Sequence, residues 1–463
     1  MIGAADRRLK PGRVALAAVL ALIACAPKIA FGLGPAVTQE LLPNGATLLV
    51  SEQHNLPLVL VRVVLDAGAR RDPTGQGGLA NLTADLLAEG TTTRSAEAIK
   101  ESIDFIGAAL GANADQDYAV VSLQVLRKDL DTGLDLLADM LLRPALKADE
   151  LARQREAVLA SIRADEDDPT SVAQKAFQRA LYGETPYGHP VEGTEASVAR
   201  LTRADVQQFY RRFYGPAGAA IVIVGDLSVD EARGALARVL GDWRGGAPAP
   251  FVYPPLSEPA ATVLHIDRPV TQAGIVLGQL GIARDNPDFE QIAVMNYILG
   301  GGGFSSRLMD NIRTQAGLAY SVGSVFAAGK SPGPFEIVMQ TKTASVGDAI
   351  ARARQQVEAI RTAPVSDAEL QEAKRYLTGS YPLRLDSNAK IADFIAQTWF
   401  YGLGSNYADV YIERVSAVTA EDVQRVAQTY LHPERFIDVV VSNTETPAAA
   451  PPAAAAPAAA PAP

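Results

Sequence analysis

Residues Gly78 to Thr91 read GLANLTADLLAEGT and form the most informative stretch of this chain. Leucines recur there at the spacing of one helix face, at positions Leu79, Leu82, Leu86 and Leu87. This spacing predicts an amphipathic helix that turns one stripe towards a core. Taken by itself, the stretch can be an ordinary core helix. Asn81, Ala84 and Asp85 would then lie on another face without a special role.

The chain follows one plan twice. The segment LTRADVQ at 201–207 is echoed by VTAEDVQ at 418–424, and the Tyr-Gly-Pro at 214–216 is echoed by the Leu-His-Pro at 431–433. In both cases the second copy begins 217 residues after the first, from 201 to 418 and from 214 to 431. A constant offset of this kind indicates a duplicated structural unit.

Hydrophobic runs place the elements of each half. Strands are predicted at 46–51, 58–66 and 220–224 in the first half, and at 261–267, 272–280 and 437–441 in the second. Helices are predicted at 78–88, 149–165, 286–299 and 367–381. Both halves therefore open with strands followed by a helix, and both close with a helix, a loop and a short apolar strand.

Antiparallel strand patterning beside helices is typical of α+β layers. We therefore predict an α+β fold of two homologous layered domains, with mainly antiparallel sheets and helices packed on one side. The predicted parts are a signal peptide at 1–32, a first domain at 38–244, a linker at 245–259, a second domain at 260–445 and an Ala/Pro-rich disordered tail at 446–463.

The amino-terminal segment indicates export. Basic residues precede an apolar run at 14–24 that is too short for a permanent membrane anchor, which is the pattern of a signal peptide. The sequence LIAC at 22–25 resembles a bacterial lipobox and would make Cys25 a lipid anchor, whereas 24–26 and 30–32 suit ordinary cleavage. We predict an exported, periplasmic protein. The net charge of −10 without a basic stripe argues against a nucleic-acid partner.

Five further motifs occur in a characteristic order. They are LPNGA at 42–46, DAGAR at 66–70, YGHP at 187–190, GGGGFSSRL at 300–308, and Arg313 followed by GLAY at 317–320. Together with the duplicated plan, they resemble the insulinase/pitrilysin-type (inverzincin) zinc peptidases over about residues 38–442. The glycine run at 300–303 lacks the Lys-Ser/Thr of a phosphate-binding loop and is interpreted as a flexible or tightly packed turn.

The resemblance implies that the zinc site of the family is lost. Those enzymes carry His-x-x-Glu-His on the helix that begins near Gly78, where this chain has Asn81, Ala84 and Asp85. The third family ligand is a Glu about seventy residues downstream, and by the apolar register Ala152 takes its place. An amide oxygen is a weak ligand, and one carboxylate is not a metal site. We therefore expect no metal in this chain.

In the bacterial two-chain branch of that family, one chain carries the zinc helix and the other supplies an Arg and a Tyr that contact substrate. The resemblance assigns these roles to Arg313 and Tyr320. We predict that Gly317 ends the helix that carries Arg313 and that Tyr320 begins a strand. Both side chains donate hydrogen bonds at neutral pH and could support a carbonyl oxygen as it becomes negative. Alternatively, both are ordinary surface residues.

The resemblance implies a non-catalytic, substrate-binding subunit of an exported zinc peptidase. It would pair with a homologous catalytic chain that bears His-x-x-Glu-His and holds the zinc, and the pair would cleave peptides. A second hypothesis is a peptide-binding or scaffold protein without proteolytic activity. A third is a peptidase that acts alone through an unusual metal site built on Asp85. We expect no catalysis by the isolated chain.

Overall fold

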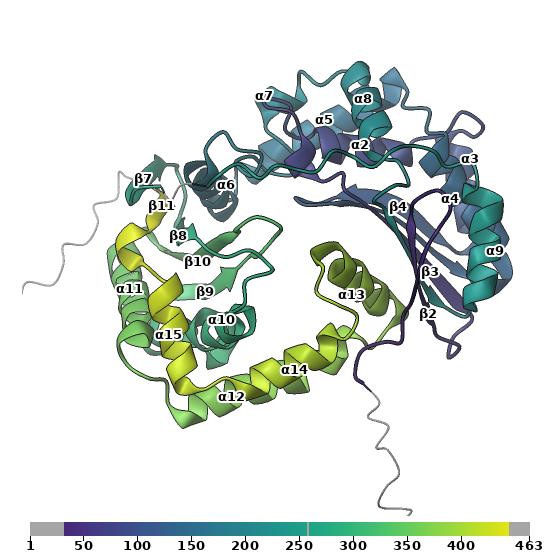
Figure 1. The fold of residues 1–463 in the computed structure, drawn as a ribbon. Coiled ribbons are helices and arrows are strands. Elements are labelled where there is room, and N and C mark those ends of the chain that lie inside the picture. Colours follow the sequence, from purple (N-terminus) through teal and green to yellow (C-terminus); the bar gives the residue numbers. More distant parts are fainter. Residues whose placement is uncertain (1–31, 257–258, 444–463) are drawn as a thin grey trace, which may run out of the picture. The chain divides into compact units, whose positions relative to one another are not determined.

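Two β-sheets form the framework of the chain (Figure 1). The structure is a computed structural model that describes residues 32–256 and 259–443. The first sheet has the strand order β1-β2-β6-β3-β5-β4, and the second has the order β7-β11-β8-β10-β9. The predicted signal peptide up to residue 31, Cys25 and the tail from residue 444 lie outside the described residues.

The strands of the first sheet are β1 Thr38–Leu41, β2 Thr47–Glu52, β3 Leu58–Leu65, β4 Ala109–Ala114, β5 Ala119–Leu126 and β6 Ala220–Gly225. Those of the second sheet are β7 Thr262–Asp267, β8 Gln272–Leu280, β9 Ala319–Phe326, β10 Pro334–Lys342 and β11 Ile437–Ser442. The two sets fall within the predicted ranges 38–244 and 260–445.

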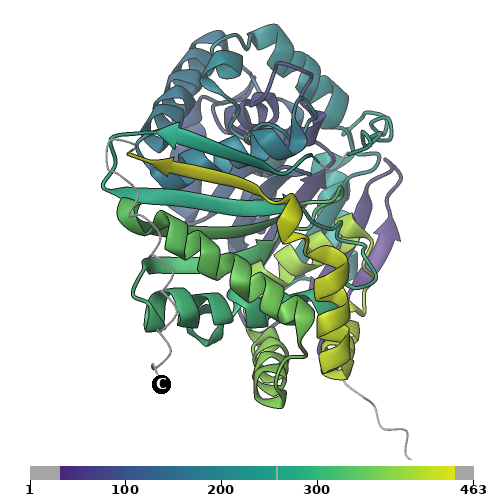
Figure 2. The ribbon, with the colours of Figure 1, turned by 90° about the vertical axis from the view of Figure 1, so that its left-hand side faces the viewer.

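Both sheets share one topology. The order β2-β6-β3-β5-β4 corresponds strand for strand to β7-β11-β8-β10-β9, and β1 is an addition at the edge of the first sheet. One pair in each sheet is parallel, β2 with β6 and β7 with β11, and the other pairs are antiparallel. In Figure 2 the yellow strand β11 lies between the teal strands β7 and β8. The predicted α+β fold and its duplication are confirmed.

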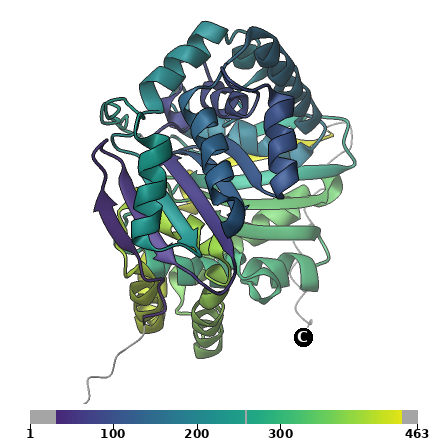
Figure 3. The ribbon, with the colours of Figure 1, turned by 90° about the vertical axis from the view of Figure 1, so that its right-hand side faces the viewer.

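Helices of the first half are α2 Leu79–Leu87, α3 Ala96–Ile106, α4 Leu130–Leu142, α5 Ala148–Asp165, α6 Pro169–Tyr182, α7 Glu195–Val198, α8 Arg203–Phe213 and α9 Val229–Leu240. Those of the second half are α10 Phe289–Asn296, α11 Val346–Thr362, α12 Asp367–Gly379, α13 Asn388–Tyr401, α14 Tyr407–Ala417 and α15 Ala420–Tyr430. Figure 3 shows helices of the first half in front of the purple strands. No helix in the described part of the chain is both long and apolar enough to cross a membrane.

The central strands of each sheet are apolar on both faces. β6 and β11 are buried along their whole length, so water is excluded from both of their sides. In β3, Val61 and Val63 face the main core of the first half, whereas Val64 faces a second apolar cluster on the other side. Because successive strand residues point to opposite faces, one helical layer cannot cover such a sheet.

The second layer comes from the opposite half. Helix α6 of the first half packs on β8 and β11, where Phe177 is buried beside Val276 and Val439. Helix α13 of the second half packs on β6 and β3, where Ile395 is buried beside Val222. The two helices occupy equivalent places, because α6 begins at residue 169 and α13 begins 219 residues later, at 388. Helices thus cover both faces of each sheet at its central strands, one more layer than the sequence predicts.

The close approach of α6 to β8 requires glycine at position 278. A Cβ atom there would lie 2.3 Å from the carbonyl oxygen of Phe335 and 2.6 Å from the ring of Phe177. We expect Gly278→Ala to lower the free energy of unfolding by roughly 1–3 kcal/mol, because overpacking displaces neighbours that cannot move freely. Urea denaturation measures the difference.

The matched control is Gly234→Ala in the middle of α9, where a Cβ atom meets nothing within 4 Å. This variant should be more stable than the unmodified chain by about 0.5–1 kcal/mol, because alanine favours the helix. Equal stability of the Gly278 variant and the unmodified chain would contradict the packing described for α6.

Candidate functional site

Helix α2 is held in place from outside its own sequence. The carboxylate of Asp72 accepts hydrogen bonds from the backbone N–H groups of Gly78 (2.9 Å) and Ala80 (2.8 Å), which have no partner within the helix. Gly78 has a φ of 93°, and a Cβ atom there would lie 2.6 Å from the carbonyl oxygen of Glu192. The leucine stripe lies in the main core of the first half, as predicted.

The positions at which the resemblance places metal ligands hold an amide–carboxylate pair. The side chain of Asn81 donates to Asp85 Oδ2 at 3.1 Å, one helical turn away, and Ala84 is fully buried. Burial raises the pKa of Asp85 to about 6, the charge of Glu89 adds to this, and the bond from Asn81 opposes it. Within the described residues, no group of three or more His, Cys, Asp or Glu side chains could hold a metal ion.

Helices α2 and α5 run antiparallel. Near the start of α5, the amide of Gln154 donates to Glu89, which follows the end of α2, at 2.5 Å. Near the end of α5, Arg163 forms an ion pair with α7. From α7, the hydroxyl of Ser197 donates to the carbonyl of Gly77, which precedes α2 (2.8 Å). The carboxyl end of α5 therefore lies beside the start of α2.

This register does not bring Ala152 to the amide–carboxylate pair. Ala152 precedes Gln154, so it lies beyond the end of α2, and it is exposed. The positions on the face of Gln154 that are one and two turns closer to the pair are Val158 and Ser161. Neither is a carboxylate, so α5 offers no third ligand. The apolar pattern of one helix does not determine how far the helix is shifted along its neighbour. The sequence therefore placed the third ligand position at Ala152, on a turn of α5 that lies too far from the pair.

In the second half, the glycine run forms a tight connection. It joins a π-helical segment, Tyr297–Gly301, to the helical segment that carries Arg313. A Cβ atom at Gly300 would lie 2.4 Å from the hydroxyl of Ser324 on β9. The N–H of Gly302 donates to the carbonyl of Tyr297, so it is not free to bind a phosphate. The prediction of a tightly packed turn agrees with this geometry.

Arg313 and Tyr320 lie together in the structure. Gly317 has a φ of 65°, and its N–H bonds to the carbonyl of Arg313 (3.0 Å) at the end of a π-helical segment, Met309–Gln315. The strand β9 then begins at Ala319, one residue before the predicted start. The Arg313 guanidinium lies 5.1 Å from the centre of the Tyr320 ring.

A third side chain completes this group. The ring of Phe304 lies 4.7 Å from the Arg313 guanidinium, and Phe304 and Tyr320 are 71% and 75% exposed. In the described part of the chain, Arg313 makes no ion pair with a carboxylate, so cation–π contacts orient it. The sequence analysis missed Phe304, although it stands inside the motif GGGGFSSRL. We call Phe304, Arg313 and Tyr320 the Arg–aromatic cluster.

Two family models match the chain. The model described as insulinase (peptidase family M16) matches residues 48–195, and the model described as the peptidase M16 inactive domain matches residues 200–377. A solved structure of a peptidase M16 inactive domain from Pseudomonas fluorescens is 31% identical, with a TM-score of 0.84 over 88% of this chain and 98% of that one. The chain belongs to peptidase family M16.

Curated relatives of this M16 chain are similar over nearly their whole length. An uncharacterized zinc protease of Streptomyces coelicolor is 28% identical over 87% of this chain and 89% of the relative. The non-peptidase homolog YmxG of Helicobacter pylori is 24% identical over 88% of this chain and 94% of the relative. The names inactive domain and non-peptidase homolog agree with the side chains at the lost metal site. Names and residues together indicate a non-catalytic member of the family.

The carboxylate of Asp85 makes the stability of the M16 chain depend on pH. Its pKa is about 6 in the fold and 3.8 without the fold, so the folded chain binds this proton more tightly. Its contribution to stability therefore falls as the pH rises from about 4 to about 6. We expect Asp85→Asn, which keeps an acceptor for Asn81, to be more stable by about 1–2 kcal/mol above about pH 7, allowing for partial exposure.

Urea denaturation at about pH 4, 6 and 7.5 measures this gap, which should be small at the lowest pH and grow with each step. The control is Asp104→Asn, at an exposed position of α3. A gap for the Asp85 variant that stays the same at all three values would contradict the assignment.

Proposed function

We propose that this chain is the non-catalytic, substrate-binding subunit of an exported zinc peptidase. Its partner is a homologous chain that bears His-x-x-Glu-His, holds the zinc and cleaves peptides. The observation that carries the proposal is the Arg–aromatic cluster. It presents a half-buried arginine that has no carboxylate partner in the described residues, in a chain whose helix α2 has no metal-ligand set.

The chemistry of the cluster suits a peptide carbonyl. The guanidinium of Arg313 is permanently charged and the phenol of Tyr320 is a hydrogen-bond donor at neutral pH. Donors of this kind support a carbonyl oxygen as negative charge develops on it during attack by metal-bound water. The two rings orient the guanidinium without a carboxylate, which would otherwise compete with the substrate for its N–H groups.

The remaining parts of the proposal concern metal and location. Zinc belongs to the partner, because Asn81, Ala84 and Asp85 supply one carboxylate and no imidazole. Export follows from the basic and apolar leader, and Cys25 offers a lipid anchor if the leader is cut before it. In the alternative proposal, the same cluster holds peptides that no partner cleaves, and the chain is a binding or scaffold protein.

The test is co-expression with an M16 chain that carries the intact zinc motif and is encoded beside this one. We expect the pair to cleave peptides. Arg313→Ala and Tyr320→Phe should each lower kcat of the pair by about 100–1,000-fold, the usual cost of losing one donor to a developing oxyanion. Tyr320→Phe keeps the ring beside Arg313 and removes only the hydroxyl, so it isolates the hydrogen bond.

Arg238→Ala is the control, because this exposed arginine of α9 pairs with Asp131 on the surface of the first half. The control pair should keep its kcat. Unchanged kcat in both cluster variants would refute the substrate role. A pair that binds peptides and does not cleave them would favour the scaffold alternative.

A further inference from the structure

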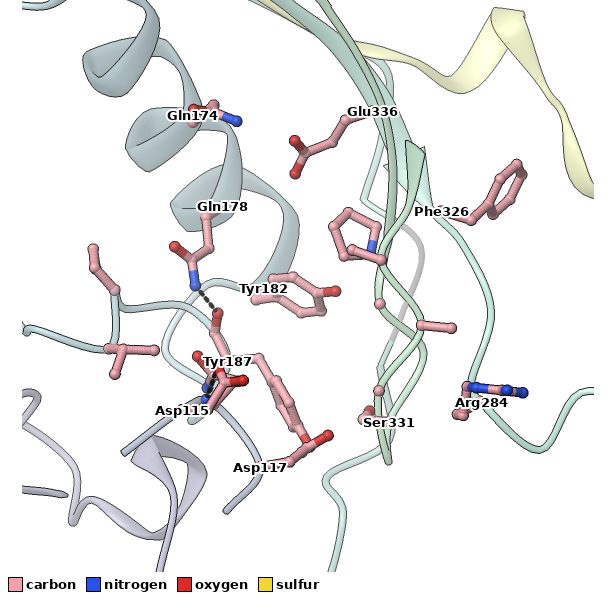
Figure 4. Close-up of a pocket in the computed structure, with 18 of the residues that line it drawn as sticks. Asp115, Asp117, Gln174, Gln178, Tyr182, Tyr187, Arg284, Phe326, Ser331 and Glu336 are labelled. Atoms are coloured by element: carbon pink, nitrogen blue, oxygen red, sulfur yellow. Dashed lines mark hydrogen bonds between the residues drawn. The ribbon is translucent and has the colours of Figure 1, made fainter. Parts of the chain in front are cut away.

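A cavity of about 780 Å³ opens between α6 of the first half and the β9–β10 connection of the second (Figure 4). This volume lies within the range of ordinary ligand sites, about 300–1,000 Å³. From α6 it is lined by Gln174, Gln178 and Tyr182, and from β10 by Glu336. No step in the proposed function uses this cavity, and the Arg–aromatic cluster does not line it.

Glu336 is the unusual group of the cavity. Its carboxyl group faces the space between α6 and β10 (Figure 4). Burial raises its pKa above the ordinary value, and a hydrogen bond from Gln174 opposes this shift. No lysine, arginine or histidine of the described residues forms an ion pair with it. A carboxylate that is largely removed from water and lacks a cation is costly, and a bound cation would offset that cost.

The basic side chains that line the cavity are already engaged. Lys175 pairs with Asp165 at 2.8 Å, and its ammonium lies 3.6 Å from Glu192. The guanidinium of Arg284 donates to the hydroxyl of Tyr407 at 2.6 Å and stacks 3.7 Å from the ring of Phe289. Neither group is available to neutralise Glu336.

The other deep carboxylate of the cavity has its own donors. Asp117 accepts hydrogen bonds from the hydroxyls of Tyr187 (2.9 Å) and Tyr401 (3.1 Å) and from the backbone N–H of Lys330 (2.8 Å). These donors come from both halves of the chain and hold the floor of the cavity together. Glu336 differs from Asp117, because no hydroxyl or backbone N–H group of the described residues donates to its carboxylate and its neighbour Gln174 is neutral.

We propose that this cavity binds a cationic group of a peptide, either a basic side chain or the amino-terminal ammonium, with Glu336 as its counterion. The aromatic ring of Tyr182 lines the same cavity as Glu336 and can contribute a cation–π contact (Figure 4). The amide nitrogen of Gln178 donates to the carbonyls of Tyr187 (2.8 Å) and His189 (3.0 Å), so its oxygen remains available to a peptide N–H. The proposal rests on the proposed function only in taking a peptide as the ligand.

Isothermal titration calorimetry on the full chain tests this assignment with synthetic peptides. The first probe is an acetylated and amidated alanine-rich peptide with one lysine, and the second has norleucine in its place. We expect the lysine peptide to bind about tenfold more tightly, the ratio that a charge-assisted hydrogen bond supplies. A norleucine peptide with a free amino terminus is the third probe, and tight binding of it identifies the terminal ammonium as the ligand.

Glu336→Gln should reduce the preference for the charged peptides to within about twofold, because the amide keeps the shape and removes the charge. Glu101→Gln removes the same charge from an exposed position of α3 and should keep the preference. Equal affinity for all peptides in the unmodified chain, including no measurable binding, would overturn the assignment. An undiminished preference in Glu336→Gln would also overturn it.

The experiments distinguish failure of the cation-site proposal from failure of the proposed function. Binding is measured without the partner, so a lost preference in Glu336→Gln supports the cavity even if variants of the Arg–aromatic cluster leave cleavage by the pair unchanged. Conversely, cluster variants that abolish cleavage, combined with no charge preference in binding, would keep the subunit role and remove the cation site.

Discussion

The structure depends on one constraint, which is that the central strands of each sheet are apolar on both sides and must be covered on both. Strands such as β6 and β11 are buried along their whole length, and the helices of one half cover only one face. The opposite half supplies the missing layer, α6 for the second sheet and α13 for the first. Each half therefore completes the core of the other. If one half stood alone, one face of its sheet would be left without its helix.

The same constraint creates the features that matter for function. Helix α6 turns Phe177 towards the second sheet, and it turns Gln174 and Gln178 towards the cavity that holds Glu336. Asp117, with donors from both halves, joins the two sides of that cavity. A binding space between the halves thus follows from the exchange of helices, with no additional element.

Packing and hydrogen bonds hold helix α2 in place. The position of α2 depends on its leucine stripe and on the hydrogen bonds that Asp72 makes to the first N–H groups of the helix. Burial of such side chains contributes about 1.5–3 kcal/mol each, so the helix keeps its place whatever occupies the outer face. Asn81 and Asp85 satisfy each other there, which makes the lost metal site a closed pair of side chains.

Local features of the fold could be predicted from the sequence, and long-range ones could not. The duplication, the strand runs, the stripe of α2 and the turn at Gly317 are set by nearby residues. The shift of α5 along α2 depends on contacts between segments that are distant in sequence. This shift places Ala152 away from Asn81 and Asp85. The exchange of α6 and α13 depends on tertiary packing in the same way. The roles assigned to Phe304 and Glu336 depend on residues that lie close to them in the fold. The spacing of residues in the sequence does not predict these contacts.

The most direct measurement is peptide hydrolysis by the purified chain alone, with and without a metal chelator, followed by addition of a homologous chain with an intact zinc motif. We expect no hydrolysis above background from the chain alone. Hydrolysis should appear when the second chain is added, and the chelator should abolish it. Chelator-sensitive hydrolysis by the isolated chain would contradict the proposal that catalysis comes from a partner.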